Sequence, residues 1–218
     1  MTEAFPAASE PPQPCTKCPR LHSFVEAQRP ANPTWHNAPV PSFGDPQGQL
    51  LIVGLAPGMR GANRTGRPFT GDYAGKVLYA ALAKYGLTSG TFDEDGEDDL
   101  TLHNVAITNA VRCVPPQNKP VGAEIKTCNP FLSALLEGMS QLRVILALGR
   151  ISHDAVLTAL GEKRSLHGFG HNAMHPLRDD FVLVDSYHCS RYNMNTGRLT
   201  VPMFDDVFAT IKVALNRS

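Results

Sequence analysis

The 218-residue sequence lacks any apolar run close to the ~20 residues that a membrane-spanning helix needs. Its first residues, MTEAFPAASEPPQP, contain neither a basic segment nor an apolar stretch, so they do not resemble a secretory signal. We therefore expect a cytoplasmic protein without a membrane partner. In that compartment, paired cysteines indicate a metal site or catalysis more often than a disulfide.

The sequence also lacks an excess of charge of one sign. It has 20 Lys and Arg against 20 Asp and Glu, whereas proteins that bind nucleic acids are commonly basic. Six of the acids, however, lie in the segment FDEDGEDD at 92–99, which leaves 14 acids against 20 bases elsewhere. The neutral total thus hides a basic body with one acidic loop, and we expect that loop to point away from any DNA.

Several motifs of cofactor enzymes are missing. No G-K-[ST] follows the glycine-rich segment 54–75, and that segment lacks the dinucleotide-binding glycine spacing, which argues against a nucleotide cofactor. The H-E-x-x-H pattern of zinc hydrolases is absent too. A metal-dependent hydrolase is therefore a weak alternative.

Strand and helix patterns alternate after residue 50. Short apolar runs at 50–54, 102–108, 144–148 and 181–185 predict strands buried on both faces, and helical spacing covers 74–85, 123–139, 151–160 and 201–215. This alternation predicts an α/β fold with a parallel sheet covered on both sides. Ten of the 18 prolines precede residue 50, and we expect a flexible tail over 1–14 and a single domain over 15–218.

Ligands of parallel sheets bind beyond the carboxyl ends of the strands, and unusual residues follow three of the predicted strands. The first is followed by six glycines and three arginines within 54–75, a composition that suits a backbone in close contact with an anion. Asp72 in this segment is either a helix N-cap or a functional carboxylate. Asn109 is either a residue whose side-chain amide binds a ligand or a turn residue at the end of a strand. His188 lies in a polar loop that contains arginines.

Four of the five cysteines suggest one site. Cys15 and Cys18 form a C-x-x-C pair in a proline-rich segment, and Cys113 and Cys128 bracket a later loop. Four thiolates hold either zinc or an iron–sulfur cluster, and the spacing does not choose between them. Either group would tie the N-terminal segment to the body, while Cys189 stands apart.

Taken together, these motifs resemble the iron–sulfur branch of the uracil-DNA glycosylase superfamily, most closely family 5 and more distantly family 4. The resemblance covers residues 15–215 and rests on the C-x-x-C pair, GLAPG, NRTGRPFTGD, ITNAVRCVPP, the later cysteine and HCSRYNMNTGRLT. It implies a three-layer α/β/α fold with a four-stranded parallel sheet, and a [4Fe-4S] cluster on the four cysteines. It also implies a monomeric DNA repair enzyme that flips a deaminated base out of DNA and hydrolyses its glycosidic bond without cutting the strand. The base is uracil, with hypoxanthine, xanthine or a modified uracil as further candidates.

The resemblance also implies roles for single residues. Phe69 would stack on the flipped base, Asn109 would bind its amide edge, and His188 would stabilise it as it departs. Leu55 is apolar where many members carry a water-activating polar residue, so Asp72 inherits that role. The substrate site would also include Gly54, Ala56 and Gly58.

The loop after His188 would enter the minor groove, with Tyr192 or Met194 filling the vacated stack. We expect DNA contacts from Arg60, Arg64, Ser190, Arg191, Asn193 and Arg198, although surface arginines are often merely solvated. Cys189 replaces the proline that relatives usually carry after the histidine, which loosens the backbone beside His188. A non-catalytic or covalently trapping reader of damaged bases is the alternative function.

Overall fold

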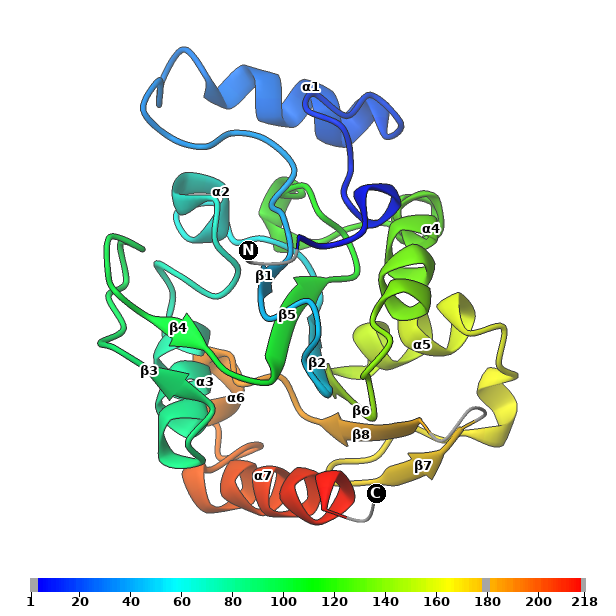
Figure 1. Cartoon of the computed structure of the whole chain (residues 1–218). Helices are drawn as coiled ribbons and strands as arrows, with labels where there is room; N and C mark the ends of the chain where they lie inside the picture. Colours follow the sequence, from blue (N-terminus) through cyan, green and yellow to red (C-terminus); the bar gives the residue numbers. More distant parts are fainter. Residues whose placement is uncertain (1–3, 178–180, 217–218) are drawn as a thin grey trace.

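A six-stranded sheet forms the centre of the molecule in a computed structural model, which describes residues 4–177 and 181–216 (Figure 1). Four parallel strands lie in the order β5, β2, β6, β8, with bounds Val105–Asn109, Leu50–Gly54, Val144–Leu148 and Val182–Ser186. They confirm the predicted α/β fold and its four parallel strands. Two short antiparallel strands, β1 (Phe43–Gly44) and β7 (Met174–Pro176), extend the edges.

The four parallel strands follow from their sequences. LLIVG, VAITN and VILAL are buried at every position, as apolar runs in a sheet covered on both faces must be. The edge strands were not predicted because they have only two or three residues and no apolar run. A separate pair, β3 (Thr88–Ser89) and β4 (Thr101–Leu102), flanks the acidic loop.

Helices cover both faces of the sheet. Tyr79, Phe204 and Phe208 of α3 (Tyr73–Lys84) and α7 (Val201–Leu215) belong to one apolar cluster. The helices α4 (Gly122–Gly138) and α5 (Arg150–Ala159) build the cluster on the opposite face. The remaining helices are short or peripheral: η1 (Ala7–Ser9), α1 (Pro19–Gln28), α2 (Ala62–Thr65), η2 (Pro116–Asn118), η3 (Arg164–Leu166) and α6 (Arg191–Asn195). Among the described residues, no helix is long and apolar enough to cross a membrane.

The register of the parallel strands places their carboxyl ends, where the polar loops begin, at the same level. Gly54 pairs with Asn109 across β2 and β5, and Leu148 pairs with Ser186 across β6 and β8. Parallel strands point the same way, so the loops that follow these residues leave from one edge of the sheet. The sheet therefore brings segments from residues 55, 110 and 187 onward to one place.

The N-terminal segment differs from the flexible tail predicted over 1–14, of which the structure describes residues 4–14. Ser9 is fully buried, and Glu10 forms an ion pair with Arg112 at 2.6 Å. Arg112 is itself buried and also donates hydrogen bonds to the Ser9 carbonyl and to Ser42 Oγ. The segment packs because it neutralises this buried guanidinium, a feature without any local sequence signal. The single domain expected over residues 15–218 stays a prediction.

Replacing Glu10 tests this packing. We expect Glu10→Ala to lower the free energy of unfolding by about 1–3 kcal/mol, because Arg112 would lose its carboxylate while remaining buried. The control is Glu26→Ala, which removes the exposed pair with Arg29 and should cost less than about 1 kcal/mol. Urea denaturation measures both, and equal losses would show that the pair of Glu10 and Arg112 stabilises the fold no more than an exposed pair does.

Candidate active site

A pocket opens at the edge of the sheet where the parallel strands end. It is bordered by the glycine-rich segment, by Asn109 at the end of β5, by Asn118 and by the loop that follows β8. Its lining includes most of the predicted site residues: Ala56, Gly58, Arg60, Phe69, Asp72, Asn109, His188, Ser190 and Arg191. Segments that are 130 residues apart in the sequence thus meet in one cavity, as the register of the sheet requires.

Gly54 allows two of these side chains to approach each other. A Cβ at this position would collide with Oδ1 of Asn109 and would lie 2.8 Å from Cζ of Phe69. Any other residue would therefore push the amide and the ring out of place. Gly54 itself contributes no surface to the pocket but shapes the floor on which Asn109 and Phe69 meet.

Phe69 and His188 form an aromatic pair. Their ring centroids are 6.1 Å apart with an interplanar angle of 23°. Phe69 has a φ of +57°, a left-handed conformation that is unfavourable for a bulky residue. Strained backbone of this kind persists where the surrounding structure over-determines it, commonly at functional sites. Here the beginning of α3 supplies that constraint, because a Cβ on Gly75 would overlap the Phe69 carbonyl.

The pocket side chains of Asn109 and His188 are available to a ligand. Within the described residues, neither the Asn109 amide nor the His188 ring makes a hydrogen bond to the protein. Burial lowers the pKa of His188 to about 4, so its ring is neutral near pH 7. A neutral imidazole and an amide offer both donors and acceptors to a planar polar ligand.

Asp72 fills both roles that the sequence left open. Its Oδ1 accepts a hydrogen bond of 2.9 Å from the Gly75 amide, which makes it the N-cap of α3. Its Oδ2 faces the glycine-rich segment, 3.5 Å from the position that a Cβ on Gly58 would take. Burial raises the pKa of Asp72, and Glu94 adds to that rise, while the amides of Gly75 and Ala74 oppose it. The cap therefore orients one oxygen and leaves the other for chemistry.

The loop after β8 is held by its own polar residues. Asn193 Nδ2 donates a hydrogen bond of 2.8 Å to the His188 carbonyl, and Ser190 caps α6 by accepting from the Asn193 amide. Two residues predicted to contact DNA thus also fix the backbone of His188. Of the two predicted wedge residues, Tyr192 is 73% exposed, whereas Met194 packs against the core. Only Tyr192 is free to enter a DNA stack.

The predicted phosphate-binding arginines differ in their surroundings. Arg60 is exposed at the pocket rim, and Arg191 lies over the Tyr73 ring at 5.6 Å. Arg198 lies over the Tyr187 ring at 4.7 Å and leaves its guanidinium edge exposed. Arg60 and Arg191 line the pocket, whereas Arg198 follows α6 in the chain and does not.

The acidic loop is tied to the glycine-rich segment, which the sequence did not predict. Arg64 pairs with Asp95 at 2.5 Å, so its predicted phosphate contact requires this pair to break. Arg67 donates two hydrogen bonds of 2.6 Å to Asp98, whose pKa falls to about 2 beside that guanidinium. Charge attraction thus holds the loop against the arginines instead of turning it away from them.

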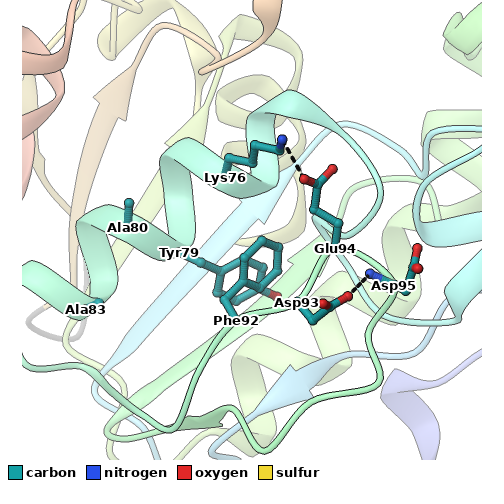
Figure 2. Close-up of a pocket in the computed structure, with 8 residues that line it drawn as sticks. All are labelled: Lys76, Tyr79, Ala80, Ala83, Phe92, Asp93, Glu94 and Asp95. Carbon is teal, nitrogen blue, oxygen red and sulfur yellow. Dashed lines mark hydrogen bonds and ion pairs between the residues drawn. The ribbon is translucent and has the colours of Figure 1, made fainter.

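A second concavity lies between α3 and the acidic loop. Figure 2 shows Lys76 paired with Glu94 across it, and the ring of Phe92 stacked on Tyr79. Asp93 and Asp95 complete its rim. This acidic hollow suits an anionic ligand poorly, and none of the strand-end residues reaches it, so the pocket beside Asn109 is the candidate active site.

The four predicted metal ligands converge beside Leu21 of α1 and Val111. Cys15, Cys18, Cys113 and Cys128 line one small cavity, and all five cysteines of the chain are free thiols. Burial and, to a smaller extent, the three neighbouring thiols raise the pKa of Cys113 to about 12, while Arg112 opposes the rise. Ionising such thiols is costly unless a cation or cluster stabilises the thiolates.

The spacing of the sulfurs bears on which group fits. A single zinc ion with bonds of about 2.3 Å holds its sulfurs within about 4 Å of one another. Within the described residues, no three cysteine sulfurs all lie within 4.8 Å of one another. The donor set consists of thiols alone, which zinc and an iron–sulfur cluster both accept. Cys189 lies elsewhere, fully buried beside α3, and its Sγ contacts the Ala74 carbonyl.

Sequence reasoning missed several residues of the pocket. Met59, Tyr73 and Asn118 also line it. Asn118 and its neighbour Gln117 both have a φ of +56°, in the turn between the second pair of cysteines. The PPQNKP sequence there signals a turn, but only the fold places that turn at the pocket.

Comparison with known proteins agrees with this geometry. The model of the uracil DNA glycosylase superfamily matches residues 41–212. A type-5 uracil-DNA glycosylase of Thermus thermophilus is 45% identical over 205 residues, which cover 91% of this chain and 92% of that protein. A type-5 enzyme of Pyrobaculum aerophilum is 38% identical, with coverage of 88% and 85%. A type-4 uracil-DNA glycosylase of the same organism is 35% identical over 150 residues, covering 68% of this chain and 62% of that protein.

Proposed function

This chain belongs to the uracil-DNA glycosylase superfamily, and we propose that it excises uracil from DNA as a monofunctional glycosylase. The observation that carries this proposal is the convergence of Phe69, Asn109, Asp72 and His188 on one pocket. A base inside a duplex is out of reach, so the nucleotide must rotate into the pocket before the chemistry. Unstacking costs a few kcal/mol and is least costly at a mismatch, which favours a deaminated base opposite guanine.

The pocket suits the flipped uracil. Phe69 offers a ring face for stacking, and the free amide of Asn109 offers a donor and an acceptor to the base edge. The neutral ring of His188 donates a hydrogen bond to the oxygen on which negative charge develops as the base departs. Backbone amides of the glycine-rich segment add to this stabilisation.

Asp72 acts on the sugar side of the reaction. Breaking the glycosidic bond produces a cationic sugar and an anionic base, so a carboxylate near the sugar stabilises the transition state. Ionised Asp72 supplies that charge and orients the attacking water through Oδ2. Within the described residues no lysine lines the pocket, which supports base removal without a Schiff base and without strand cleavage.

The four cysteines fit a [4Fe-4S] cluster held by Cys15, Cys18, Cys113 and Cys128. Bound there, the cluster supplies structural cross-linking and not a reaction step. It would join the N-terminal segment to the PPQNKP turn, whose Asn118 borders the active site. In our proposal this link holds one wall of the pocket.

The DNA surface would run from Arg60 to the loop after β8. Arg60, Arg191 and Arg198 would contact phosphates, with Ser190 and Asn193 nearer the flipped nucleotide and Tyr192 in the vacated stack. Arg64 joins them only where phosphate displaces Asp95. Three further properties stay predictions. The enzyme would also excise hypoxanthine, xanthine or a modified uracil, it would act as a monomer, and it would be located in the cytoplasm.

The central role of Asp72 is testable without loss of its cap. Asparagine caps helices as well as aspartate, so Asp72→Asn keeps α3 while removing the charge. We expect its single-turnover excision rate on a uracil-containing oligonucleotide to fall at least about tenfold, the lower range for a general base. Alkali-labile abasic sites report the product.

Asp45→Asn is the matched control. Asp45 also accepts a backbone hydrogen bond, from the Gln47 amide at 2.9 Å, and it lies beside Val105 at the start of β5, so the loss of its charge should leave excision unchanged. Equal excision by Asp72→Asn and the wild type would exclude Asp72 from catalysis. A wild type that binds uracil-containing DNA yet releases no base would instead favour a non-catalytic reader.

The pH dependence follows from the pKa of Asp72, which burial raises. Only the ionised carboxylate serves, so the rate should fall as the pH is lowered, with a midpoint above the ordinary aspartate pKa of about 3.9. His188 is already neutral above about pH 4, so its titration should not change the excision rate near neutral pH. Single-turnover rates across the acidic range measure this; a rate that stays constant down to the ordinary value would contradict it.

The cluster is tested by a pair of cysteine variants. We expect Cys113→Ser to lose iron and the brown absorbance of the protein, because it removes one of four converging ligands. Cys189→Ser changes a more deeply buried thiol outside the four-cysteine site and should retain both iron and colour. One equivalent of zinc in the wild type, in place of iron, would refute the cluster.

A further inference from the structure

A second set of metal-ligand side chains lies behind the loop that carries His188. Asp185 of β8, His153 of α5 and His175 of β7 each direct one ligand atom to a common point, and these atoms all lie within 4.8 Å of one another. Asp185 and His153 are almost completely buried, and His175 is 12% exposed. In Figure 1, β8 and the edge strand β7 lie at the edge of the sheet away from α1, and α5 contacts β8.

The hydrogen bonds around His153 pose a problem that a cation solves. Its Nε2 lies 2.9 Å from the His167 carbonyl, which can only accept, so Nε2 carries the proton of a neutral ring. Its Nδ1 then presents a lone pair 2.7 Å from Oδ1 of Asp185, which is an acceptor as well. Two electron-pair donors this close need a positive charge between them, which either a second ring proton or a metal ion supplies.

The surroundings match those of known metal ligands. A histidine that binds a metal commonly donates its other ring proton to a backbone carbonyl, as His153 does to His167. The second oxygen of Asp185 lies 3.0 Å from Nε2 of His175 and accepts a hydrogen bond from the Gly170 amide at 3.3 Å. His153 and Asp185 are thus oriented by groups outside the set.

We propose that His153, His175 and Asp185 bind a divalent transition-metal ion of the zinc class. Two imidazole nitrogens and one carboxylate oxygen are a ligand set that zinc accepts, with bonds of about 2.0–2.2 Å. The ion would cross-link α5 and the edge strand β7 to β8. Its ligand Asp185 lies two residues before the start of the loop that carries His188. Oxygen and nitrogen ligands distinguish this site from the four cysteines.

Cobalt(II) titration of the full-length protein tests the proposal, because cobalt reports its ligands by absorbance. A site made of imidazole and carboxylate gives only weak visible bands, whereas thiolates add an intense near-ultraviolet band. We expect about one equivalent of cobalt to bind the wild type without the thiolate band. His175→Gln, on the partly exposed edge strand, should weaken that binding roughly tenfold or more.

His103→Gln is the control, since His103 is an exposed histidine that contacts only Ser89 through its ring. It should bind cobalt like the wild type. As an independent readout, zinc should raise the Tm of the wild type and of His103→Gln but not that of His175→Gln. Equal cobalt uptake by wild type and His175→Gln, or uptake with the thiolate band only, would overturn the proposal and leave His153 as a doubly protonated ring.

Discussion

The register of four parallel strands is the constraint on which the active site depends. Because Gly54 lies level with Asn109, the glycine-rich segment and the Asn109 amide leave the sheet side by side. The same alignment brings the end of β8 to that edge, so the His188 ring reaches Phe69. A shift of one strand by one residue would turn these side chains toward the opposite face of the sheet.

At the edge of this sheet, the site combines a rigid backbone with polar side chains that have no hydrogen-bond partner in the described part of the protein. Phe69 is held in a left-handed conformation by the beginning of α3, and Asp72 is oriented by capping the same helix. The Asn109 amide and the His188 ring, by contrast, keep their hydrogen-bonding capacity. A preorganised site of this kind stabilises charge that develops in a transition state without reorganising during the reaction.

Sequence patterns were sufficient for the parts of the fold that depend on local burial. The four parallel strands were predicted within about three residues because each is an uninterrupted apolar run, and the main helices because their spacing is regular. The motifs around Asp72, Asn109 and His188 also indicated the pocket, since parallel strands place their loops at one edge. These inferences needed no knowledge of distant contacts.

Other features depend on partners far apart in the sequence and had no local signal. The pair of Glu10 and Arg112 orders the N-terminal segment, and the pair of Arg64 and Asp95 closes the acidic loop over an arginine that was expected to meet DNA. The set of His153, His175 and Asp185 likewise joins three elements, each of which contributes a single polar residue. Only the folded arrangement shows that these charges meet.

The most direct test of the account is a crystal structure of the protein with DNA that carries the abasic product, together with free uracil. We expect the uracil ring to stack on Phe69, to form hydrogen bonds with the Asn109 amide and to lie within hydrogen-bonding distance of His188. We also expect Oδ2 of Asp72 to face the emptied sugar. A base bound outside this pocket, or an Asp72 carboxylate turned away from the sugar, would contradict it.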